Sequence, residues 1–443
     1  MKIKTHVEES LGANPAEAAF DPADSVAMGV PRWLASGRGQ VFRALVHREY
    51  RLLFLAFLIN QTGFWVAHLS IQGLTVAISH NDPLHIGMVF FSLFLPAFAL
   101  APLAGVAADR FDRKRIVVVC YVAVIALALA LSALTHGGRM TMPWLFGLTF
   151  LLGSAFAFSG PANMAIAANS VPREDLSSAV SLQSALNNLT RVVGPMLAGP
   201  LVASGRFDVA FGLYAIAAGA AGILVARIRL TPWEPAAEED LGILGRIASG
   251  FAHARERHPA LPALAMTAML SLFGASHVTV LSIYAQDRLG DVNWFPWIVS
   301  AIGAGALAGA LVIGGRRPRL ASAARNTVAY GVLLAGFGFS ATPALAIGLE
   351  ALIGFFYFAV MTELQTLIQG IVDESMRGRV MSLFQVCWAG LIPFGSLGMG
   401  AAAGALGVGA TLVLSGTACA VCGVWMALRA NAYAAAERSA TSA

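Results

Sequence analysis

The chain has 443 residues, of which 57% are hydrophobic and only 12% are charged, and its mean hydropathy is +0.71. Soluble domains contain about 45–50% apolar and about 25% charged residues, so this composition excludes an ordinary soluble protein. A net charge of +5 is compatible with nucleic-acid binding, but the basic residues fall in short clusters between apolar runs. That placement is typical of the inner loops of a membrane protein.

The first 47 residues precede the first apolar run and are polar, with Pro15, Pro22 and Pro31 among them. A secretory signal peptide has a basic start followed directly by an apolar core, and no such core follows here. We therefore expect residues 1–47 to form a disordered cytoplasmic tail.

Four cysteines lie inside apolar runs, at Cys120, Cys387, Cys419 and Cys422. The last two have the C-x-x-C spacing of some metal and redox sites, but no further Cys or His flanks them as a second half-site. We interpret all four as small apolar side chains and expect no bound metal.

Twelve apolar runs follow the tail, each near the length of about 20 residues that crosses a bilayer. They cover residues 52–78, 84–108, 116–135, 143–168, 178–203, 208–228, 261–285, 293–314, 325–342, 344–369, 380–405 and 408–429. The predicted fold class is therefore an all-α membrane protein with twelve transmembrane helices. The runs form a first six-helix half (48–228) and a second six-helix half (261–430), followed by a short, unstructured cytoplasmic tail (431–443).

A polar stretch, residues 229–260, separates the two halves. Within it, Leu241, Leu244, Ile247 and Phe251 recur at helical spacing. This pattern predicts a cytoplasmic linker with an amphipathic helix on the inner membrane surface.

The placement of lysine and arginine predicts the orientation of the chain. If the N-terminus lies inside, nearly all of the 29 basic residues fall in the inner loops and tails, whereas the outer loops carry Arg139, Arg206 and Arg288. We therefore expect both termini in the cytoplasm and the helices in a bacterial-type cytoplasmic (inner) membrane.

An internal repeat relates the two halves, because several glycines recur at positions about 201 residues apart. The pairs are Gly153 and Gly354, Gly194 and Gly395, and Gly199 and Gly400. Two parallel halves related by an axis along the membrane normal are a known transporter architecture, in which the substrate site lies near the midplane. The repeat thus predicts two pseudo-symmetric six-helix halves with a cavity between them.

A charged stretch separates the second and third apolar runs. Its main residues are Gly105, Asp109, Arg110, Arg113, Lys114 and Arg115. Burying so many charges in lipid is unfavourable, so this stretch must lie at the membrane surface.

The fifth run contains a Gly194-Pro195 pair, followed by Ala198 and Gly199. A Gly-Pro pair bends a helix, because proline removes one backbone hydrogen bond. From the residues alone, the pair is either a packing kink or part of a transport mechanism.

Together these motifs resemble the major facilitator superfamily. The charged stretch is similar to the G-x-x-x-D-R-x-x-R-K-R loop between spans two and three, and the Gly-Pro pair is similar to the antiporter motif G-P-x-x-G-G, with Ala198 replacing one glycine. Residues 160–163, 171–174 and 377–383 resemble the subgroup of the enterobactin exporter and the macrolide-efflux-like permeases. The resemblance covers most of residues 45–430 and implies the superfamily's fold of two six-helix halves.

The resemblance implies a gate at the charged stretch, in which Asp109 faces the N-terminal end of span eleven, near Arg379, and stabilises an outward-facing state. A carboxylate at a helix N-terminus contributes about 0.3–1 kcal/mol or more when partly buried. The alternative is a basic loop that only sets the topology. The matching loop of the second half, residues 314–319, has no aspartate, so a gate there is not expected.

The antiporter-like motif implies export rather than import, again by resemblance. Span four lacks the R-x-x-Q-G element that commoner drug–proton antiporters carry. The proton-coupling arginine of those antiporters therefore has no counterpart in this chain.

Three charged residues lie inside apolar runs. Arg191 is about fourteen residues into the fifth run and thus near the midplane, where its permanent charge requires a partner or a water-filled cavity. Glu363 and Glu350 lie in the tenth run, where burial favours the neutral carboxyl and so permits proton transport. We expect Glu363 to be the protonation site and Glu350 to be a weaker candidate; alternatively, Glu363 pairs with a neighbour and holds helices together.

Polar residues on one face of the first run are candidates for the cavity wall. Gln61, Trp65, His68 and Gln72 share that face, which must point into the protein because polar groups are unfavourable against lipid. The alternative is a hydrogen-bonded seam between helices, and His68 titrates at physiological pH only if it is solvated. Weaker candidates for the cavity wall are Asn163, Tyr284 and Gln365.

These features predict a secondary active transporter that exports a small amphipathic or hydrophobic molecule, such as a drug or siderophore, by alternating access and with proton coupling. The alternatives are an importer or a lysophospholipid flippase on the same fold and, in another class, a non-transporting membrane scaffold or sensor. We expect a monomer whose partners are its substrate, protons and membrane lipid, with no nucleic acid. The proton gradient would be the energy source, and no cofactor is expected.

Enzymatic motifs are missing from the sequence. There is no G-x-x-x-x-G-K-[ST] run for ATP, and no Ser–His–Asp or His–Glu-x-x-His arrangement. We therefore expect neither ATP-driven transport nor catalysis on a substrate.

Overall fold

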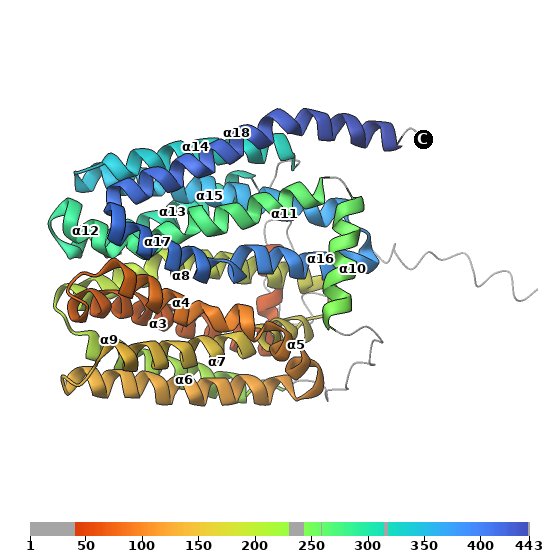
Figure 1. Cartoon of the computed structure of the whole chain (residues 1–443). Coiled ribbons are helices and arrows are strands. Elements are labelled where there is room, and N and C mark those ends of the chain that lie inside the picture. The colour runs from red at the N-terminus through yellow and green to blue at the C-terminus, as the bar shows by residue number, and fades with distance from the viewer. Residues whose placement is uncertain (1–39, 230–242, 258, 314–317, 442–443) are drawn as a thin grey trace, which may run out of the picture.

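The computed structural model describes residues 40–229, 243–257, 259–313 and 318–441 (Figure 1). All regular elements in this part of the chain are helices, and nine helical segments within it are long and apolar enough to cross a membrane. Each predicted apolar run coincides with one helix or with consecutive helices. The expected all-α membrane fold is confirmed.

The helices of the first half lie side by side and roughly parallel to one common axis (Figure 1). Their bounds are η1 Gln40–Val46, α3 Arg48–Ile78, α4 Pro83–Ala99, α5 Ala101–Arg110, α6 Arg113–His136, α7 Met142–Asn169, η2 Arg173–Asp175, α8 Leu176–Ala203 and α9 Phe207–Ala226. Helix α3 packs against α8 and α9, and α6 packs against α7 and α9.

The second half contains several broken helices. Its bounds, with the preceding linker helix, are α10 Ile243–Glu256, α11 Ala260–Met269, η3 Leu270–Gly274, η4 Ala275–Val280, α12 Leu281–Leu289, η5 Val292–Trp294, α13 Phe295–Ile313, α14 Leu320–Phe339, α15 Pro343–Ile371, α16 Glu374–Gln385, η6 Val386–Gly390, α17 Ile392–Leu406 and α18 Val408–Thr441. The predicted seventh span is thus α11 and α12 joined by a π-helical turn (η3) and a 3₁₀ turn (η4). Such interruptions often mark functional sites.

The internal repeat appears in the structure as equivalent helix contacts. Gly153 of α7 packs against the backbone of α4 at Leu93, and Gly354 of α15 packs against the backbone of α13 at Ile302. A Cβ atom at either glycine would overlap the opposing carbonyl group. Small residues let membrane helices approach this closely, so the same packing solution occurs once in each half.

A second glycine pair repeats another contact. Gly194 of α8 lies against Trp65 of α3, and Gly395 of α17 lies against the backbone of η3 at Leu272. In both halves, therefore, a glycine in the fifth span packs against the first span of the same half.

The third pair joins the two halves to each other. A Cβ atom on Gly199 of α8 would lie 3.5 Å from Pro296 Cβ of α13, and one on Gly400 of α17 would lie 2.6 Å from the carbonyl oxygen of Pro83 in α4. Helices α8 and α13 form one long contact between the halves, and α4 and α17 form the other. The pseudo-symmetric arrangement of the two halves is confirmed by these matched pairs.

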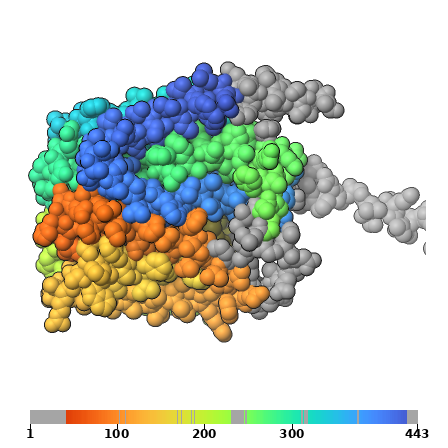
Figure 2. Space-filling model, viewed as in Figure 1, coloured from red at the N-terminus to blue at the C-terminus, as the bar shows by residue number. Residues whose placement is uncertain are grey.

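The two ends of the bundle differ in how the halves meet. We call them the α12 end and the α10 end (Figure 1). At the α12 end, Asn81 Nδ2 donates a 2.6 Å hydrogen bond to Asp287 Oδ1 across the halves. Further along α4 and α17, away from this end, Phe394 of α17 packs edge-on against Phe91 and Phe98 of α4, with ring centroids 5.7 and 5.4 Å apart. Figure 2 shows the two halves in continuous contact along α17.

Helix α10 lies within the predicted linker and rests on α16. Arg257 NH2 donates to both carboxylate oxygens of Asp373, at 2.8 and 2.6 Å, and Gly250 packs against Arg379. Phe251 is half exposed. Residue Leu241 and the side chains of the other two apolar positions in the predicted amphipathic pattern lie outside the described residues, so the amphipathic character of the linker stays a prediction.

Two expectations about the tails need correction. Residues 40–47, expected to be disordered, include the 3₁₀ helix η1, where Ala44 N donates a 2.9 Å hydrogen bond to Ser178 Oγ of α8. Helix α18 continues to Thr441, so residues 431–441 are helical rather than unstructured. Residues 1–39 lie outside the described part of the chain.

Candidate functional site

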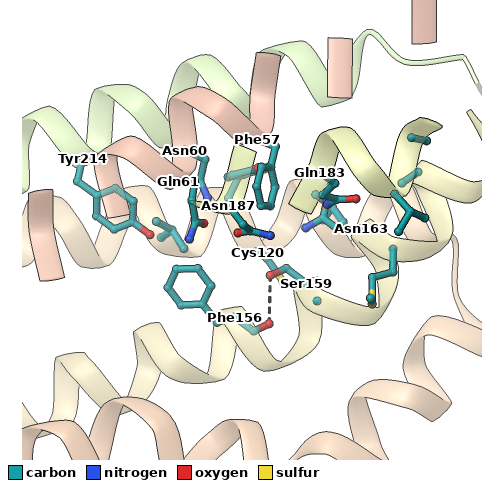
Figure 3. Close-up of a pocket in the computed structure, with 18 of the residues that line it drawn as sticks. Phe57, Asn60, Gln61, Cys120, Phe156, Ser159, Asn163, Gln183, Asn187 and Tyr214 are labelled. Atoms are coloured by element: carbon teal, nitrogen blue, oxygen red, sulfur yellow. Dashed lines mark hydrogen bonds between the residues drawn. The ribbon is translucent and has the colours of Figure 1, made fainter. Parts of the chain in front are cut away.

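A cavity of about 600 Å³ lies among helices of the first half (Figure 3). Its wall comes from α3, α6, α7, α8 and α9 and is mostly apolar, with aromatic side chains that include Phe57, Tyr121, Phe156 and Tyr214. On α7 the wall runs from Phe156 to Ala167, a rise of about 16 Å. The volume falls within the range of about 300–1,000 Å³ typical of small-molecule pockets.

Five side-chain amides interrupt this apolar wall, and we call the space the amide cavity. They are Asn60 and Gln61 of α3, Asn163 of α7, and Gln183 and Asn187 of α8. Gln183 and Asn187 are four residues apart and therefore share a helix face. Figure 3 shows Gln61 and Asn187 directed toward the same space above Phe156. The sequence predicts Gln61 and Asn163 as wall residues, and the structure places both there.

The amide cavity does not lie where the repeat predicts a cavity. We expected a space between the two halves, whereas every residue of this wall belongs to the first half. The second half approaches the site one helical turn away, at Arg191.

Arg191 follows Asn187 by one turn of α8 and reaches the junction of the halves. Its guanidinium carbon lies 4.5 Å from the ring centroid of Phe358 in α15 and 5.8 Å from that of Trp65 in α3. Its Nε is buried and has no hydrogen-bond partner. Arg191 is therefore held by aromatic rings from both halves rather than by an acidic residue.

The antiporter-like motif positions this arginine. Gly194 packs so closely on Trp65 that an added Cβ atom would lie 3.0 Å from Trp65 Cγ and nearer still to its Cβ. Pro195 lies inside α8, and Ala198 is fully buried. The motif thus brings the Trp65 ring to Arg191 by removing side-chain volume.

Glu350 lies in a different place and has a partner that the sequence analysis missed. Its side chain is 0% exposed, and its Oε2 lies 3.2 Å from Nε2 of His277, which is 3% exposed. His277 belongs to η4, where the seventh span is broken, and its Nδ1 donates to the carbonyl oxygen of Gly274 at 2.7 Å. The Glu350 Oε1 atom is buried without a hydrogen-bond partner.

Glu363 lies at the N-terminus of α14, and its role in proton coupling stays a prediction. It is 4% exposed, its Oε1 accepts a 3.2 Å hydrogen bond from the backbone N–H of Arg319, and its Oε2 accepts one of 3.4 Å from Asn326 Nδ2. Arg319 is the N-cap residue of α14. The carboxylate of Glu363 therefore stabilises the N-terminus of a neighbouring helix, where negative charge is favourable.

The predicted polar face of α3 is divided among three environments. Gln61 lines the amide cavity and Trp65 contacts Arg191, whereas His68 is 5% exposed and packed among aromatic rings. The His68 ring stacks on Phe64 at 5.5 Å, and its Nε2 lies 3.2 Å from Gln72 Nε2. His68 and Gln72 therefore lie away from the cavity.

Tyr284 and Gln365, the weaker candidates, also lie outside the amide cavity. Tyr284 is fully buried, and its hydroxyl donates a 2.9 Å hydrogen bond to the carbonyl oxygen of Ser340. This bond ties α12 to the end of α14. Gln365 is half-buried on α15.

The predicted gating loop makes local contacts to helix ends. Arg113 Nε donates to the Ala108 carbonyl oxygen at 3.3 Å, and Lys114 Nζ donates to that of Ile228 at 2.8 Å. Positive charge at a helix C-terminus is favourable, so these residues hold the ends of α5 and α9. The remaining basic residues of the stretch, Arg110 and Arg115, are exposed, and no atom lies within 4 Å of a Cβ built on Gly105. The side chain of Asp109 lies outside the described residues, so its gating contact stays a prediction.

Several residues of these sites were not predicted from the sequence, among them His277, Phe358, Asn60, Gln183 and Asn187. His277 lies in an apolar run, and only the break in the helix marks it. Phe358 lies in the aromatic run 355–358, which covers every face of its helix, and Gln183 belongs to no recognisable motif. A search for amides one turn before Arg191 would have found Asn187 and then Gln183.

Comparison with known proteins identifies the family of the chain. A sequence model of the family described as transmembrane secretion effector matches residues 40–442. The chain is 26% identical over 379 residues to the uncharacterized MFS-type transporter YfiS of Bacillus subtilis, covering 81% of this chain and 87% of that protein.

The names of two further relatives refer to efflux or export. Macrolide efflux protein A of Streptococcus pyogenes is 23% identical over 340 residues, covering 73% of this chain and 82% of that protein. The enterobactin exporter EntS of Shigella boydii is 28% identical over 360 residues, covering 76% of this chain and 81% of that protein.

Solved structures share the fold. The crystal structure of the nucleoside transporter NupG (D323A mutant) superposes with a TM-score of 0.68 at 14% identity, covering 86% of this chain and 98% of that one. Because the family model spans nearly all of the described residues and the helices repeat in two matched halves, the chain belongs to the transmembrane secretion effector family of the major facilitator superfamily of membrane transporters.

Proposed function

We propose that this transporter exports a small amphipathic or hydrophobic molecule by alternating access, driven by inward proton movement. The amide cavity carries the proposal, since its wall combines aromatic and aliphatic surface with five amide groups. Such a wall binds apolar molecules that carry a few hydrogen-bonding groups. The efflux relatives support export as the direction.

For proton coupling, we propose the pair formed by His277 and Glu350. The Nδ1 atom of His277 must carry a proton, because its partner, the Gly274 carbonyl, only accepts. The 3.2 Å contact between His277 Nε2 and Glu350 Oε2 also needs a proton, on one atom or the other. The pair therefore holds two protons: one on His277 Nδ1 and one between His277 Nε2 and Glu350 Oε2. A neutral imidazole beside a carboxylate would hold only one.

Losing that proton would leave a buried carboxylate facing a ring nitrogen lone pair. The side chains that interact with the pair include the phenols of Tyr330 and Tyr284, and a phenol with the usual pKa of about 10 is neutral at pH 7. None of these neutral groups compensates a bare charge, and an unpaired buried carboxylate is strongly unfavourable. Deprotonation thus favours a conformation in which water reaches the pair, which couples the proton to the conformational change.

The test is transport by the purified full chain in liposomes, with ethidium, erythromycin and the anion 2-naphthoate as probes and an imposed pH gradient of either polarity. We expect probe movement opposite to the proton flow in the wild type. Glu350→Gln should lose the response to the gradient while still exchanging probe across the membrane without one.

The matched control is Glu363→Gln, which alters the other buried carboxylate. We expect it to keep the gradient response. If Glu350→Gln and His277→Gln respond to the gradient as the wild type does, the coupling assignment is wrong. If the wild type moves none of the three probes against the proton flow, the export proposal itself is wrong.

A further inference from the structure

Arg191 is a cation inside the bundle whose charge the protein does not neutralise. Among the described residues it forms no ion pair, and its buried Nε atom has no hydrogen-bond partner. A guanidinium keeps its proton in proteins, so Arg191 cannot avoid this cost by becoming neutral. The chain therefore leaves a positive charge at the junction of its halves.

The surroundings of Arg191 stabilise a cation only in part. The ring faces of Phe358 and Trp65 lie 4.5 and 5.8 Å from the guanidinium carbon. Aromatic faces attract cations, but more weakly than a carboxylate or phosphate does in a desolvated site. An anion bound beside these rings would complete the site.

Arg191 is also close to the amide cavity. Asn187 precedes it by four residues on α8, and Gln61 precedes Trp65 by four residues on α3, so each pair shares one helix face. Asn187 and Gln61 both line the cavity. A molecule that fills the cavity and extends by one helical turn, about 5.4 Å, would reach the level of the guanidinium group.

We propose that Arg191 binds an anionic group of the transported molecule, so that the substrates of this protein are amphipathic organic acids. The guanidinium would hold the carboxylate, sulfonate or phosphate, in the bidentate geometry that arginine favours. The rings of Trp65 and Phe358 pack beside the apolar part next to that group, and the amides bind the polar remainder. This inference rests on the proposed transport function and adds the charge class of the substrate.

The position of Arg191 also links binding to the conformational cycle. Trp65 belongs to α3 of the first half and Phe358 belongs to α15 of the second half. The backbone of Arg191 lies against α13 at Gly303 as well. An anion bound here would therefore contact both halves at once, which is the requirement for a ligand that shifts their relative arrangement.

The test compares ligands that share one ring and differ in charge. The probes are 2-naphthoate, 2-naphthalenesulfonate and 2-naphthyl phosphate as anions, 2-naphthamide as the neutral molecule, and 2-naphthylmethylammonium as the cation. Binding is measured by calorimetric titration of the purified full chain in a neutral detergent, without a gradient. We expect at least one anion to bind tenfold or more tightly than 2-naphthamide.

Variants of Arg191 then test whether this residue is responsible for the preference for anionic ligands. Arg191→Gln and Arg191→Met should remove the preference for the anion without changing 2-naphthamide affinity, and Arg191→Lys should retain part of it. Arg206→Gln is the control, because it removes an exposed arginine at the α12 end. The melting temperature of each variant shows whether it folds. Glutamine and methionine differ in volume and polarity, so an effect that both substitutions share comes from the lost charge.

Two results would overturn the proposal. One is an absence of anion preference in the wild type; the other is a preference that survives in both Arg191→Gln and Arg191→Met. A lipid headgroup has similar chemistry, so the titration is repeated in nanodiscs of phosphatidylcholine with and without phosphatidylglycerol. If the anion preference disappears only in nanodiscs that contain phosphatidylglycerol, the lipid headgroup binds Arg191, and the proposal that Arg191 binds the substrate is wrong. Gradient-driven ethidium transport could still succeed in that case, so the proposed function is tested separately.

Discussion

Three charged side chains inside the bundle are stabilised in three different ways. Arg191 lies against two aromatic rings, Glu350 lies against His277, and Glu363 accepts hydrogen bonds at the N-terminus of α14. At the N-terminus of α14, the hydrogen-bond donors and the helix dipole favour the charged form of Glu363, while its burial favours the neutral form. The same residue type therefore has different partners at two levels of α15.

A substitution at Glu363 tests its structural role. Glu363→Ala removes both hydrogen bonds to α14, so we expect a loss of stability of about 1 kcal/mol, the usual value of a helix cap. Glu363→Gln keeps one acceptor oxygen and should lose less. The measurement is the melting temperature in detergent. Unchanged stability in Glu363→Ala together with loss of gradient-driven transport would instead assign the proton to Glu363.

The two glycines of the antiporter-like motif, Gly194 and Gly199, should differ in their tolerance of a side chain. Gly194→Ala forces a Cβ atom into Trp65, whereas at Gly199 the nearest atom is Pro296 Cβ at an ordinary 3.5 Å. We expect Gly194→Ala to destabilise the protein by about 1–3 kcal/mol, as overpacked cores do, and to displace Trp65 from Arg191. Gly199→Ala should be nearly neutral in melting temperature. Equal effects of the two substitutions would contradict the steric explanation of the motif.

At the scale of whole helices, close packing and local breaks have separate roles. Helix α15 packs along α13 through Gly354 and the glycines of α13, and both helices are continuous there. The seventh span instead breaks into η3 and η4, which places His277 opposite Glu350. The continuous helices hold the second half together, while the broken one presents polar groups that a regular helix would have bonded to itself.

Two glycines on α15, Gly354 and Gly348, allow the effect of helix packing on stability to be distinguished from the effect of helix propensity. Gly354→Ala would drive a Cβ atom into the Ile302 carbonyl, so we expect a clear fall in melting temperature and weaker α13–α15 packing. At Gly348 no atom lies within 4 Å of an added Cβ. Gly348→Ala should therefore be neutral or raise stability by up to about 1 kcal/mol, because alanine favours helix more than glycine does. A fall in melting temperature of similar size for both would show that packing at Gly354 is not the cause.

At the scale of the whole molecule, the halves are bridged at the α12 end. Asn81 and Asp287 meet there across the halves, and α4 lies along α17 (Figure 2). At the α10 end, the bonds described above for Lys114 and Arg257 join helices within one half. If alternating access operates, the bridge at the α12 end must break in each cycle.

A disulfide across this bridge should stop transport. Asn81→Cys with Asp287→Cys, in a background where Cys120, Cys387, Cys419 and Cys422 are alanine, places two thiols where the two side chains now touch. We expect oxidation to abolish probe transport and reduction to restore it, as measured in the same liposomes. Each single cysteine variant is the control and should be insensitive to oxidation. Full transport by the oxidised double variant would show that this end does not open.

Much of the fold can be predicted from the sequence, because the thickness of the bilayer sets the length of each membrane-spanning helix. A span needs about 20 apolar residues, so the twelve runs could be read directly, and each coincides with helix in the structure. The glycines at an offset of 201 residues could also be read, since only glycine permits the contacts found at Gly153 and Gly354. The embedded charges were visible for the same reason, because charge is rare in lipid.

What surrounds each charge could be decided only by the tertiary structure. Glu350 and His277 are 73 residues apart, and Trp65 and Phe358 reach Arg191 from opposite halves. Helical periodicity tells which residues share a face, but not which neighbouring helix covers that face or where a helix breaks. The partners therefore depend on how each helix is rotated and packed, and that is why one glutamate lies at a helix end while another lies against a histidine.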